Sequence, residues 1–535
     1  MKKTILCLAW LLSLSPLIFA QYANSPSTLK MDMALYAIKN LYVDRVNADK
    51  LVEEGLRAMI KDLDPHSAYM TVDEVKQMNE PLQGGFDGIG ISFNMLNDTL
   101  FVIEVISGGP SEKVGLLPGD RIIKVDGQAI AGVKMSNIEV MKRLKGPKGT
   151  SVTVSIKRRG NKDLKDFKII RDKIPIYSLD VAFMVDKTTG YIKLNRFGAT
   201  TVEEFRQAFG ELKKQGMTQL VLDLQSNGGG LMNAATDLAD EFLSDKKCIV
   251  YTEGLYSPRQ QSDATANGCF EKGKLIVLID EYSASASEIL SGAIQDWDRG
   301  LIIGRRSFGK GLVQRPIPLS DGSMLKLTVS RYFTPSGRFI QKPYDNAENY
   351  SNDLIDRYNR GEMANADSIH FPDSLKTSTL INKRTIYGGG GIMPDVFVPM
   401  DTTRFTSLHK IMAASGIMNR FSIKYVDTHR SDLNATYSKV NDFIEKFSVN
   451  DSMINQMIRM AEAEKITISD EDRKSDKTLL KKQLKAYIAR DFGKNADYYK
   501  VMYDEDKSLN EARRILEKKN AYDEILKKNK IYERN

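Results

Sequence analysis

Three serines lie at one turn between an apolar strand and a helix. The segment LIVLIDEYSASASEILSGAIQD places Ser283, Ser285 and Ser287 just after a predicted strand that ends at Asp280. Backbone N–H groups at the start of a helix have no partner within the helix, so they can stabilise a nearby negative charge. An exposed hydroxyl at such a turn suits a nucleophile. Serines also serve there as plain capping residues, so the pattern alone leaves their role open.

A nucleophilic serine needs a base that takes its proton. None of the histidines lies between residues 178 and 345; they are His66, His370, His409 and His429. This absence disfavours a Ser-His-Asp triad and favours a Ser-Lys pair. Lys310, in GRRSFGKGLVQRPIPL, lies between two glycines and near apolar side chains. A dry setting would lower the pKa of a lysine from roughly 10.4 by several units, as a base requires. The alternative is a solvated surface lysine.

The same segment contains a partial phosphate-loop pattern. Gly304, Gly309 and Lys310 match GxxxxGK, but Gly311 stands where a magnesium-binding Ser or Thr would follow. The next residues, GLVQRPIPL, predict a strand where a phosphate loop would begin a helix. Nucleotide binding is therefore not expected. HExxH and zinc-type cysteine spacings are also absent, so we expect no metal and no other cofactor.

A glycine triplet follows another predicted strand. In VLDLQSNGGGLM, Gly228, Gly229 and Gly230 precede a predicted helix. Without a Cβ, their N–H groups can approach an oxyanion closely. A flexible turn without a chemical role is the alternative.

A second glycine loop lies nearer the amino terminus. GFDGIGISF places Gly88, Ile89, Gly90 and Ile91 directly before a predicted strand. The N–H groups of such a loop can hold a terminal carboxylate, and the strand can accept a peptide as an added strand. A simple hairpin turn is the alternative.

Regions of different pattern must position these residues. Residues 27–80 have apolar residues at helical spacing, and residues 84–173 are short β-rich runs with one helical stretch. Residues 178–345 alternate strand and helix, which predicts a mostly parallel sheet covered by helices. Functional loops of such a sheet lie at the carboxyl ends of its strands.

The rest of the chain is more polar. Residues 346–385 predict an irregular insertion, and GGGGIMPDVFVPM closes the core near residue 400. Residues 401–535 are charged and mostly helical, which indicates a packing or interaction domain without chemistry of its own.

The first twenty residues have the pattern of a signal peptide. Lys2 and Lys3 precede an apolar run that ends at Ala20. The run is about 16 residues long and contains Pro16, so it is shorter than the roughly 20 residues of a membrane-spanning helix. We expect residues 1–20 to be removed and the protein to be exported to the periplasm. An uncleaved signal would associate it with the inner membrane.

The net charge bears on nucleic-acid binding, and the cysteines bear on disulfide formation. The net charge is +8 over 535 residues, and no basic tract is interleaved with aromatics, so nucleic-acid binding is not expected. Cys248 and Cys269 remain after removal of the signal. Export permits a disulfide between them, but two unpaired thiols are equally compatible with the sequence.

Together these segments resemble the carboxy-terminal processing (tail-specific) protease family, over about residues 30 to 400. SASASEILSGAIQD followed by GRRSFGKGLVQ is the most specific part, supported by LDLQSNGGG, VSRYFTPSGRFIQ and GGIMPDV. The resemblance implies a multidomain α+β fold. Its expected parts are a helical N-terminal region (27–80), a PDZ domain (84–173), an α/β protease core like those of ClpP and crotonase (178–400), and a helical C-terminal domain (401–535).

The resemblance also assigns roles by matching motifs. It implies that Ser285 is the nucleophile, Lys310 the base, and Gln314 the residue that orients the lysine; in an extended segment the last two share one strand face. Asp296, in IQDWD, matches an aspartate described in a charge-relay triad of some relatives. The implied oxyanion donors are the backbone N–H groups of Gly228 or Gly229 and of Ala286.

The implied activity is that of a serine endopeptidase that cleaves extracytoplasmic proteins near their C-termini. Its partners would be polypeptides with free C-termini, which the PDZ domain engages through Gly88–Ile91. The insertion and the helical tail lie outside the family pattern, and the tail would suit an adaptor or self-association. Two other hypotheses are a non-catalytic PDZ-type peptide-binding scaffold and a hydrolase of non-peptide acyl substrates.

Overall fold

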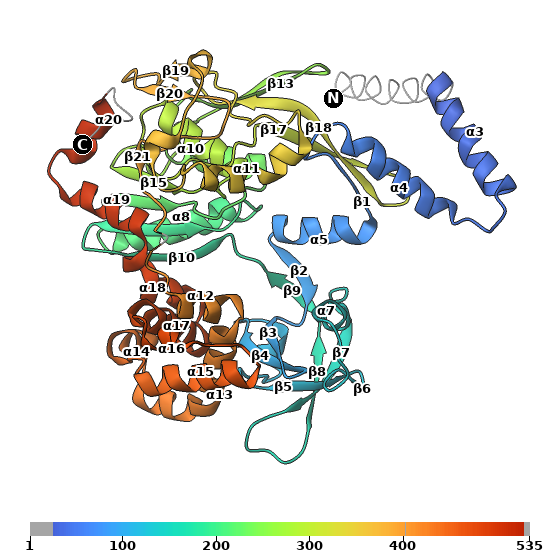
Figure 1. Cartoon of the computed structure of the whole chain (residues 1–535), viewed down its shortest axis with the longest axis vertical. Coiled ribbons are helices and arrows are strands. Elements are labelled where there is room, and N and C mark those ends of the chain that lie inside the picture. Colours follow the sequence, from blue (N-terminus) through green and yellow to red (C-terminus); the bar gives the residue numbers. More distant parts are fainter. Residues whose placement is uncertain (1–24, 402, 529–535) are drawn as a thin grey trace, which may run out of the picture. The chain divides into compact units, whose positions relative to one another are not determined.

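The computed structural model describes residues 25–401 and 403–528 (Figure 1). The predicted signal peptide lies outside these residues. The chain divides into two compact parts: residues up to Asp73 together with Gln314–Thr328, and the remainder.

The first part is mainly helical. It contains α3 (Pro26–Leu41), α4 (Ala48–Lys61) and the short strand β1 (Ala68–Met70), and α5 (Val72–Leu82) begins at its end. The side chains of Ser25 and Asn47 cap the first two helices. Between α4 and β1 the Asp64 carboxylate accepts hydrogen bonds from the Ser67 hydroxyl and from two backbone N–H groups. This turn ends the helical pattern and directs β1 to pair with the first residues of β18 (Met324–Phe333).

The β-rich region folds as an antiparallel sheet in the order β3-β4-β5-β7-β8. Its strand β3 (Ile91–Leu96) lies at one edge and pairs with β4 (Thr99–Val105). The other elements are β2 (Gly85–Gly88), α6 (Pro110–Lys113), β5 (Arg121–Val125), β6 (Gln128–Ala129), α7 (Asn137–Leu144), β7 (Ser151–Lys157), β8 (Lys165–Ile170) and β9 (Asp172–Pro175). Buried aliphatic side chains of these strands and of α7 form its core.

The alternating region forms a second sheet in the order β10-β11-β12-β15-β16-β21. All neighbours from β11 onward are parallel, and β10 is antiparallel at the edge. The strands are β10 (Leu179–Met184), β11 (Thr189–Leu194), β12 (Gln219–Asp223), β15 (Leu275–Ile279), β16 (Leu301–Gly304) and β21 (Val396–Phe397). The middle strands are buried along their whole length, which explains their continuous apolar runs. The predicted strand–helix alternation is confirmed.

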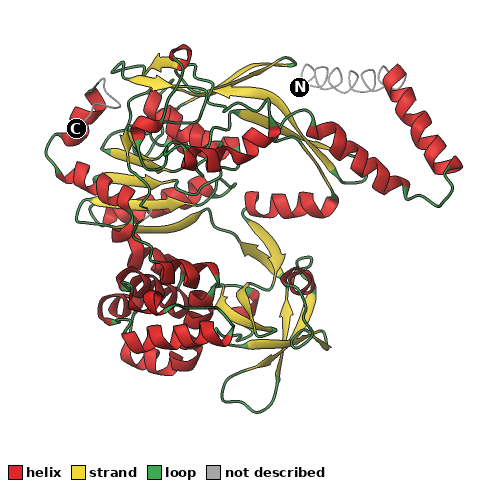
Figure 2. Cartoon of the chain, in the orientation of Figure 1, coloured by secondary structure: helices red, strands yellow, loops and turns green. Residues whose placement is uncertain are grey.

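Helices cover both faces of this sheet (Figure 2). On one face lie α8 (Thr201–Lys214), α9 (Met232–Asp240) and α10 (Ala286–Asp296). On the other face lie α19 (Lys507–Glu517) and α20 (Ala521–Lys527), from the end of the chain. The expected domain boundary at residue 400 did not anticipate that helices of the tail pack against the sheet. These helices, α19 and α20, complete the core on that face.

Another sheet combines a hairpin that lies between β12 and β15 in the chain with two strands that follow β16, and the insertion comes after these strands. β13 (Cys248–Gly254) pairs with β14 (Ser257–Asp263) and with the end of β18, and β17 (Leu312–Pro318) also pairs with β18. The insertion contains α11 (Ala347–Asn359), 3-10 turns at 366–368 and 373–375, and the hairpin β19 (Lys376–Ser378) and β20 (Thr385–Tyr387). The prediction of irregular structure was therefore wrong at residues 347–359, where Asn346 caps a helix. Buried Arg357 secures that helix by donating to the carbonyls of Arg306 and Ser307.

Both described cysteines are free thiols. Burial raises the pKa of Cys248 to about 11. Burial and the neighbouring Glu241 raise the pKa of Cys269 to about 12. Both thiols therefore stay protonated near neutral pH, and the disulfide left open by the sequence is not formed.

The rest of the tail is a helical bundle, as predicted. It comprises α12 (Ser407–Ala414), α13 (Ile417–Thr436), α14 (Val440–Lys446), α15 (Asp451–Ala463), α16 (Asp470–Lys474), α17 (Thr478–Phe492) and α18 (Asn495–Met502). These helices share one apolar core. No helix in the described part of the chain is both long and apolar enough to cross a membrane.

We expect Leu509→Ala to lower the thermal unfolding temperature of the protein. Leu509 is fully buried between α19 and the sheet, and truncating a buried leucine costs about 2–5 kcal/mol. Leu255→Ala is the matched control, because Leu255 is 88% exposed and its loss should leave the melting temperature unchanged. Equal melting curves for the two variants would show that α19 does not stabilise the sheet.

Candidate active site

Ser285 lies at the turn between β15 and α10, in an unusual backbone conformation. Its φ is 57° and its ψ is −112°, a region that costs a non-glycine residue free energy and that clusters at functional sites. Ser285 is partly exposed, whereas Ser283 and Ser287 are buried. The hydroxyls of these two donate to the backbone carbonyls of Leu224 and Asn227, in the loop after β12, each at 2.8 Å. Of the three serines, Ser285 is thus the one placed to react.

A buried carboxylate, Glu288, joins this turn to the loop that carries Lys310. Its Oε2 accepts the backbone N–H of Ser285 at 2.8 Å and that of Lys310 at 2.8 Å. Its Oε1 accepts the Ser307 hydroxyl at 2.5 Å and the Gly309 N–H at 2.7 Å. Because one oxygen accepts both amides, the backbones of Ser285 and Lys310 run side by side.

Glu288 is fully buried, and burial raises the pKa of its carboxyl, while the four hydrogen bonds oppose that rise. Sequence reasoning missed this residue. The signal was the Ser-x-x-Glu spacing of Ser285 and Glu288, which is the pattern of a capping box at a helix start.

Further hydrogen bonds hold the Lys310 loop from both sides. The Phe308 N–H donates to the Ser283 carbonyl at 3.0 Å, and the Gly311 N–H donates to Gln341 Oε1 at 2.8 Å. Gly309 has φ +90° and packs against the backbone of residues 390 and 391. Strand β17 follows directly, so the structure lacks the helix of a phosphate loop, as the sequence indicated.

The glycine triplet packs directly on the Ser285 turn. A Cβ on Gly229 would lie 2.9 Å from Ser285 Cβ and 2.9 Å from the Ala286 nitrogen. Gly230 is as restricted, since a Cβ there would lie 2.1 Å from the Phe197 carbonyl oxygen. The Gly229 N–H donates to Asn227 Oδ1 at 2.9 Å. The structure thus brings the predicted oxyanion loop against the predicted nucleophile.

Asp296 is placed differently from the role that the resemblance implies. It ends α10, eleven residues after Ser285, so it lies roughly 16 Å along the helix axis from Ser285. Its carboxylate forms a buried ion pair with Arg338 and accepts the Ser336 N–H at 2.8 Å. Asp296 therefore secures the loop after β18 and does not adjoin the Ser285 hydroxyl.

Gln314 belongs to the first compact part of the chain. It follows Lys310 by four residues, on β17, and its Nε2 donates to Thr328 Oγ1 at 3.1 Å. Its role in orienting the lysine stays a prediction.

The predicted peptide-binding loop joins β2 to the edge strand β3. Gly90 has φ +76°, and its carbonyl accepts the Ile106 N–H at 3.0 Å. Within the described residues β3 pairs only with β4. Its other edge offers the backbone groups that an added peptide strand would use.

Among the described residues, no group of three or more His, Cys, Asp or Glu side chains is arranged to hold a metal ion. The Ser285 turn brings a strained serine, the backbone of Lys310 and the glycine loop together. Such a set suits acyl transfer.

The chain also matches models of known protein families. The model of peptidase family S41 matches residues 188–346, and a PDZ domain model matches residues 88–170. A family of unknown function (DUF8443) matches residues 408–493. The chain is 38% identical over 309 residues to a carboxy-terminal-processing protease of Bartonella bacilliformis, covering 57% of this chain and 70% of that protein.

Two solved structures are also similar. A photosystem II D1 C-terminal processing protease is 31% identical, with 58% of this chain and 90% of that one covered and a TM-score of 0.34. The PDZ domain of a carboxy-terminal protease from Vibrio cholerae, in complex with peptide, is 31% identical, with 17% and 97% covered and a TM-score of 0.16. From the extent and identity of the Bartonella match and from the two domain models, we conclude that the chain belongs to the S41 family of serine peptidases, the C-terminal processing proteases that carry a PDZ domain.

Proposed function

We propose that this protease cleaves extracytoplasmic polypeptides near their C-termini with Ser285 as nucleophile and Lys310 as general base. The observation that carries the proposal is the Glu288 carboxylate, which holds the strained Ser285 turn and the Lys310 backbone on one oxygen. A nucleophile and its base must lie within hydrogen-bond reach of each other. Because Ser285 and Lys310 donate their backbone N–H groups to the same buried oxygen, their backbones are held close together. The signal-peptide pattern supports action in the periplasm.

In the proposed reaction Lys310 Nζ takes the proton of Ser285 Oγ as that oxygen attacks the peptide carbonyl carbon. The oxyanion that forms accepts hydrogen bonds from the N–H groups of Gly228 and Ala286; Gly229 donates to Asn227 instead. Ala286 begins α10, so its N–H has no partner within the helix. Lys310 gives the proton that it took from Ser285 to the leaving amine as the peptide C–N bond breaks. Lys310 then takes a proton from the water that attacks the acyl carbon, and it returns that proton to Ser285 Oγ as the ester bond breaks.

Glu288 is not proposed as the base. It is fully buried and already accepts four hydrogen bonds. Its role is to position the reacting residues through their backbones.

The PDZ domain is proposed to bind the free C-terminus of the substrate. The Gly88–Ile91 loop would receive the carboxylate, and the peptide would extend the sheet at β3, whose edge is open in the described structure. Binding at this domain would bring the end of a polypeptide to the protease core.

Replacing either reacting residue should abolish proteolysis. We expect Ser285→Ala and Lys310→Ala each to lower kcat by at least about 1000-fold on a peptide with an apolar free C-terminus. Ser320→Ala and Lys272→Ala, at exposed positions, are the matched controls and should retain wild-type rates. Unchanged cleavage by the first two variants would exclude the pair. Absence of cleavage by the wild type would favour a binding scaffold, and cleavage of esters alone would favour an acyl hydrolase.

Removing the charge of Glu288 should slow the chemical step. In Glu288→Gln one acceptor oxygen becomes an N–H donor that faces two existing donors, so the turn and the loop must shift. We expect kcat to fall by about 100-fold, as when a catalytic group is misplaced by about 1 Å, with little change in KM. Glu253→Gln, at an exposed position, controls for the substitution itself. An unchanged kcat in a folded Glu288→Gln variant would contradict the positioning role.

A blocked substrate C-terminus should weaken substrate binding. We expect C-terminal amidation of a peptide substrate to raise KM by about 10-fold, because hydrogen bonds to a charged carboxylate contribute about 1.5–3 kcal/mol. The kcat should change little, since the cleaved bond is unaltered. Steady-state kinetics on the acid and amide forms of one peptide make the comparison. Equal KM values would show that the PDZ domain does not recognise the carboxylate.

A further inference from the structure

The end of the chain contacts the loop that leads to the predicted oxyanion hole. Asp506 lies at the start of α19, where its Oδ1 caps the helix by accepting the N–H groups of Ser508 and Leu509 at 2.8 and 3.0 Å. Its Oδ2 accepts a hydrogen bond from Gln225 Nε2 at 2.7 Å. Gln225 directly precedes the Ser226–Gly230 loop. Asp506 lies outside all three matched family models.

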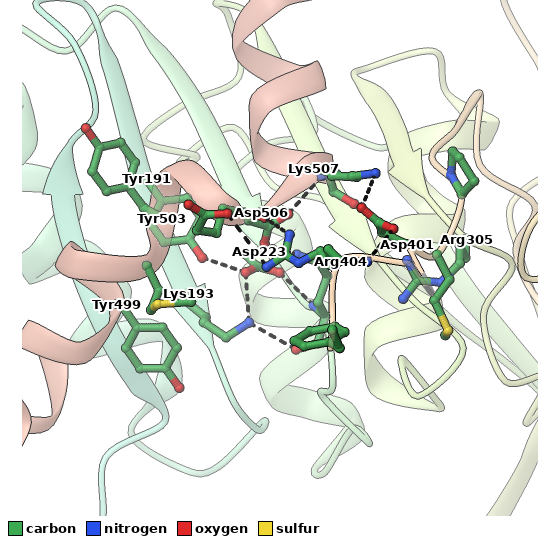
Figure 3. A pocket seen from close by; sticks show the side chains of 17 residues that line it. Tyr191, Lys193, Asp223, Arg305, Asp401, Arg404, Tyr499, Tyr503, Asp506 and Lys507 are labelled. Carbon is green, nitrogen blue, oxygen red and sulfur yellow. Dashed lines mark hydrogen bonds and ion pairs between the residues drawn. The ribbon is translucent and has the colours of Figure 1, made fainter. Parts of the chain in front are cut away.

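This contact forms one wall of a cavity of about 320 Å³ between the core and the tail (Figure 3). The strand ends of β11 and β12 contribute Lys193 and Asp223, and the tail contributes Tyr499 and Asp506. Figure 3 shows Asp223 and Asp506 next to each other at the centre of the cluster. Asp223 is buried, Lys193, Tyr499 and Asp506 are partly buried, and all four are hydrogen-bonded.

Two carboxylates of the core accept hydrogen bonds from Gln225 and Ser226, the successive residues that lead into the glycine loop. Asp223 accepts the Gln225 N–H at 2.7 Å, and it also accepts Lys193 Nζ at 2.8 Å. Asp280 accepts both the N–H and the hydroxyl of Ser226, at 2.9 and 3.2 Å. Gln225 is therefore fixed at its backbone by the core and at its side chain by the tail.

A displacement at Gln225 would reach the reacting groups within a few residues. Asn227 bonds to the Ser285 turn on both sides: its carbonyl accepts the Ala284 N–H at 3.1 Å and the Ser287 hydroxyl at 2.8 Å. Gly228 and Gly229 follow, and Gly229 lies against Ser285 Cβ. A loop this short and this tightly bonded transmits a shift at its start to its glycines.

The charge and burial around Asp506 make its hydrogen bond with Gln225 sensitive to substitution of either residue. Burial and the nearby charge of Asp223 raise the pKa of Asp506, while the bonds from Leu509 and Gln225 oppose the rise. Gln225 and Asp506 are both partly buried, so loss of either one would remove a hydrogen bond that solvent replaces only in part.

We propose that Asp506 is a positioning residue of the protease: by holding Gln225, helix α19 sets the glycine loop in the geometry that supplies the oxyanion hole. The inference rests on the proposed function. It gives the tail a second role beside covering the sheet, because the active site is complete only when α19 is docked.

The test compares Asp506→Ser and Gln225→Ala with the double variant. Serine still caps a helix but is too short to reach Gln225. We expect each single change to lower kcat by about 10- to 100-fold with KM within about twofold, and the double variant to be no slower than the slower single one. Asp504→Asn is the matched control, since Asp504 pairs with Lys482 in the tail and should leave kcat unchanged.

Two further readouts separate positioning from stability and from the proposed function. Inactivation by a peptidyl phosphonate, whose adduct with the serine also needs the oxyanion hole, should slow in parallel with kcat, while the melting temperature of Gln225→Ala stays near that of the wild type. An unchanged kcat, additive effects in the double variant, or a loss confined to Asp506→Ser with a lower melting temperature would each overturn the inference alone. A wild-type protein without proteolysis would overturn both proposals.

Discussion

The geometry of the active site depends on one buried carboxylate. Glu288 is fully buried and accepts hydrogen bonds from the backbones of Ser285, Gly309 and Lys310 and from the Ser307 hydroxyl. A charge buried in this way is stable only when its acceptor capacity is filled. The strained conformation of Ser285 is held by the same bonds, so the reactive turn and the stability of the buried charge depend on each other.

The sheet beneath the site explains why distant segments converge there. Parallel strands place their carboxyl ends at one edge, and β12, β15 and β16 lead there into the glycine loop, the Ser285 turn and the Lys310 loop. Such a sheet must be covered on both faces. The matched protease region supplies α8, α9 and α10 on one face, and the tail supplies α19 and α20 on the other. The tail thereby reaches the edge where the loops emerge.

Much of this could be predicted from the sequence. Continuous apolar runs bounded by glycine and polar residues indicated the parallel strands, because local periodicity reflects how a segment is buried. Short β-rich runs indicated the sheet of residues 84–173, and the family resemblance identified it as a PDZ domain. The missing histidines near the serines, and the missing Ser or Thr after Lys310, directed attention to a lysine. The family resemblance then selected Ser285 among three serines, and the hydrogen bonds of the other two agree with that choice.

Other features depend on contacts between residues far apart in the chain, which local patterns do not encode. Sequence reasoning missed Glu288, although its spacing from Ser285 is that of a capping box, while the fold makes it the link to a loop about twenty residues later. Asp296 matched a motif, yet helix length and the Arg338 partner place it elsewhere. The polar insertion looked irregular because Arg357, which secures its helix, finds the carbonyls of Arg306 and Ser307 only in the folded chain. By itself the sequence determined the strands, the turns and the reactive residue types; the tertiary structure decided which buried charges hold them together, because a buried charge is defined by partners that only folding brings near.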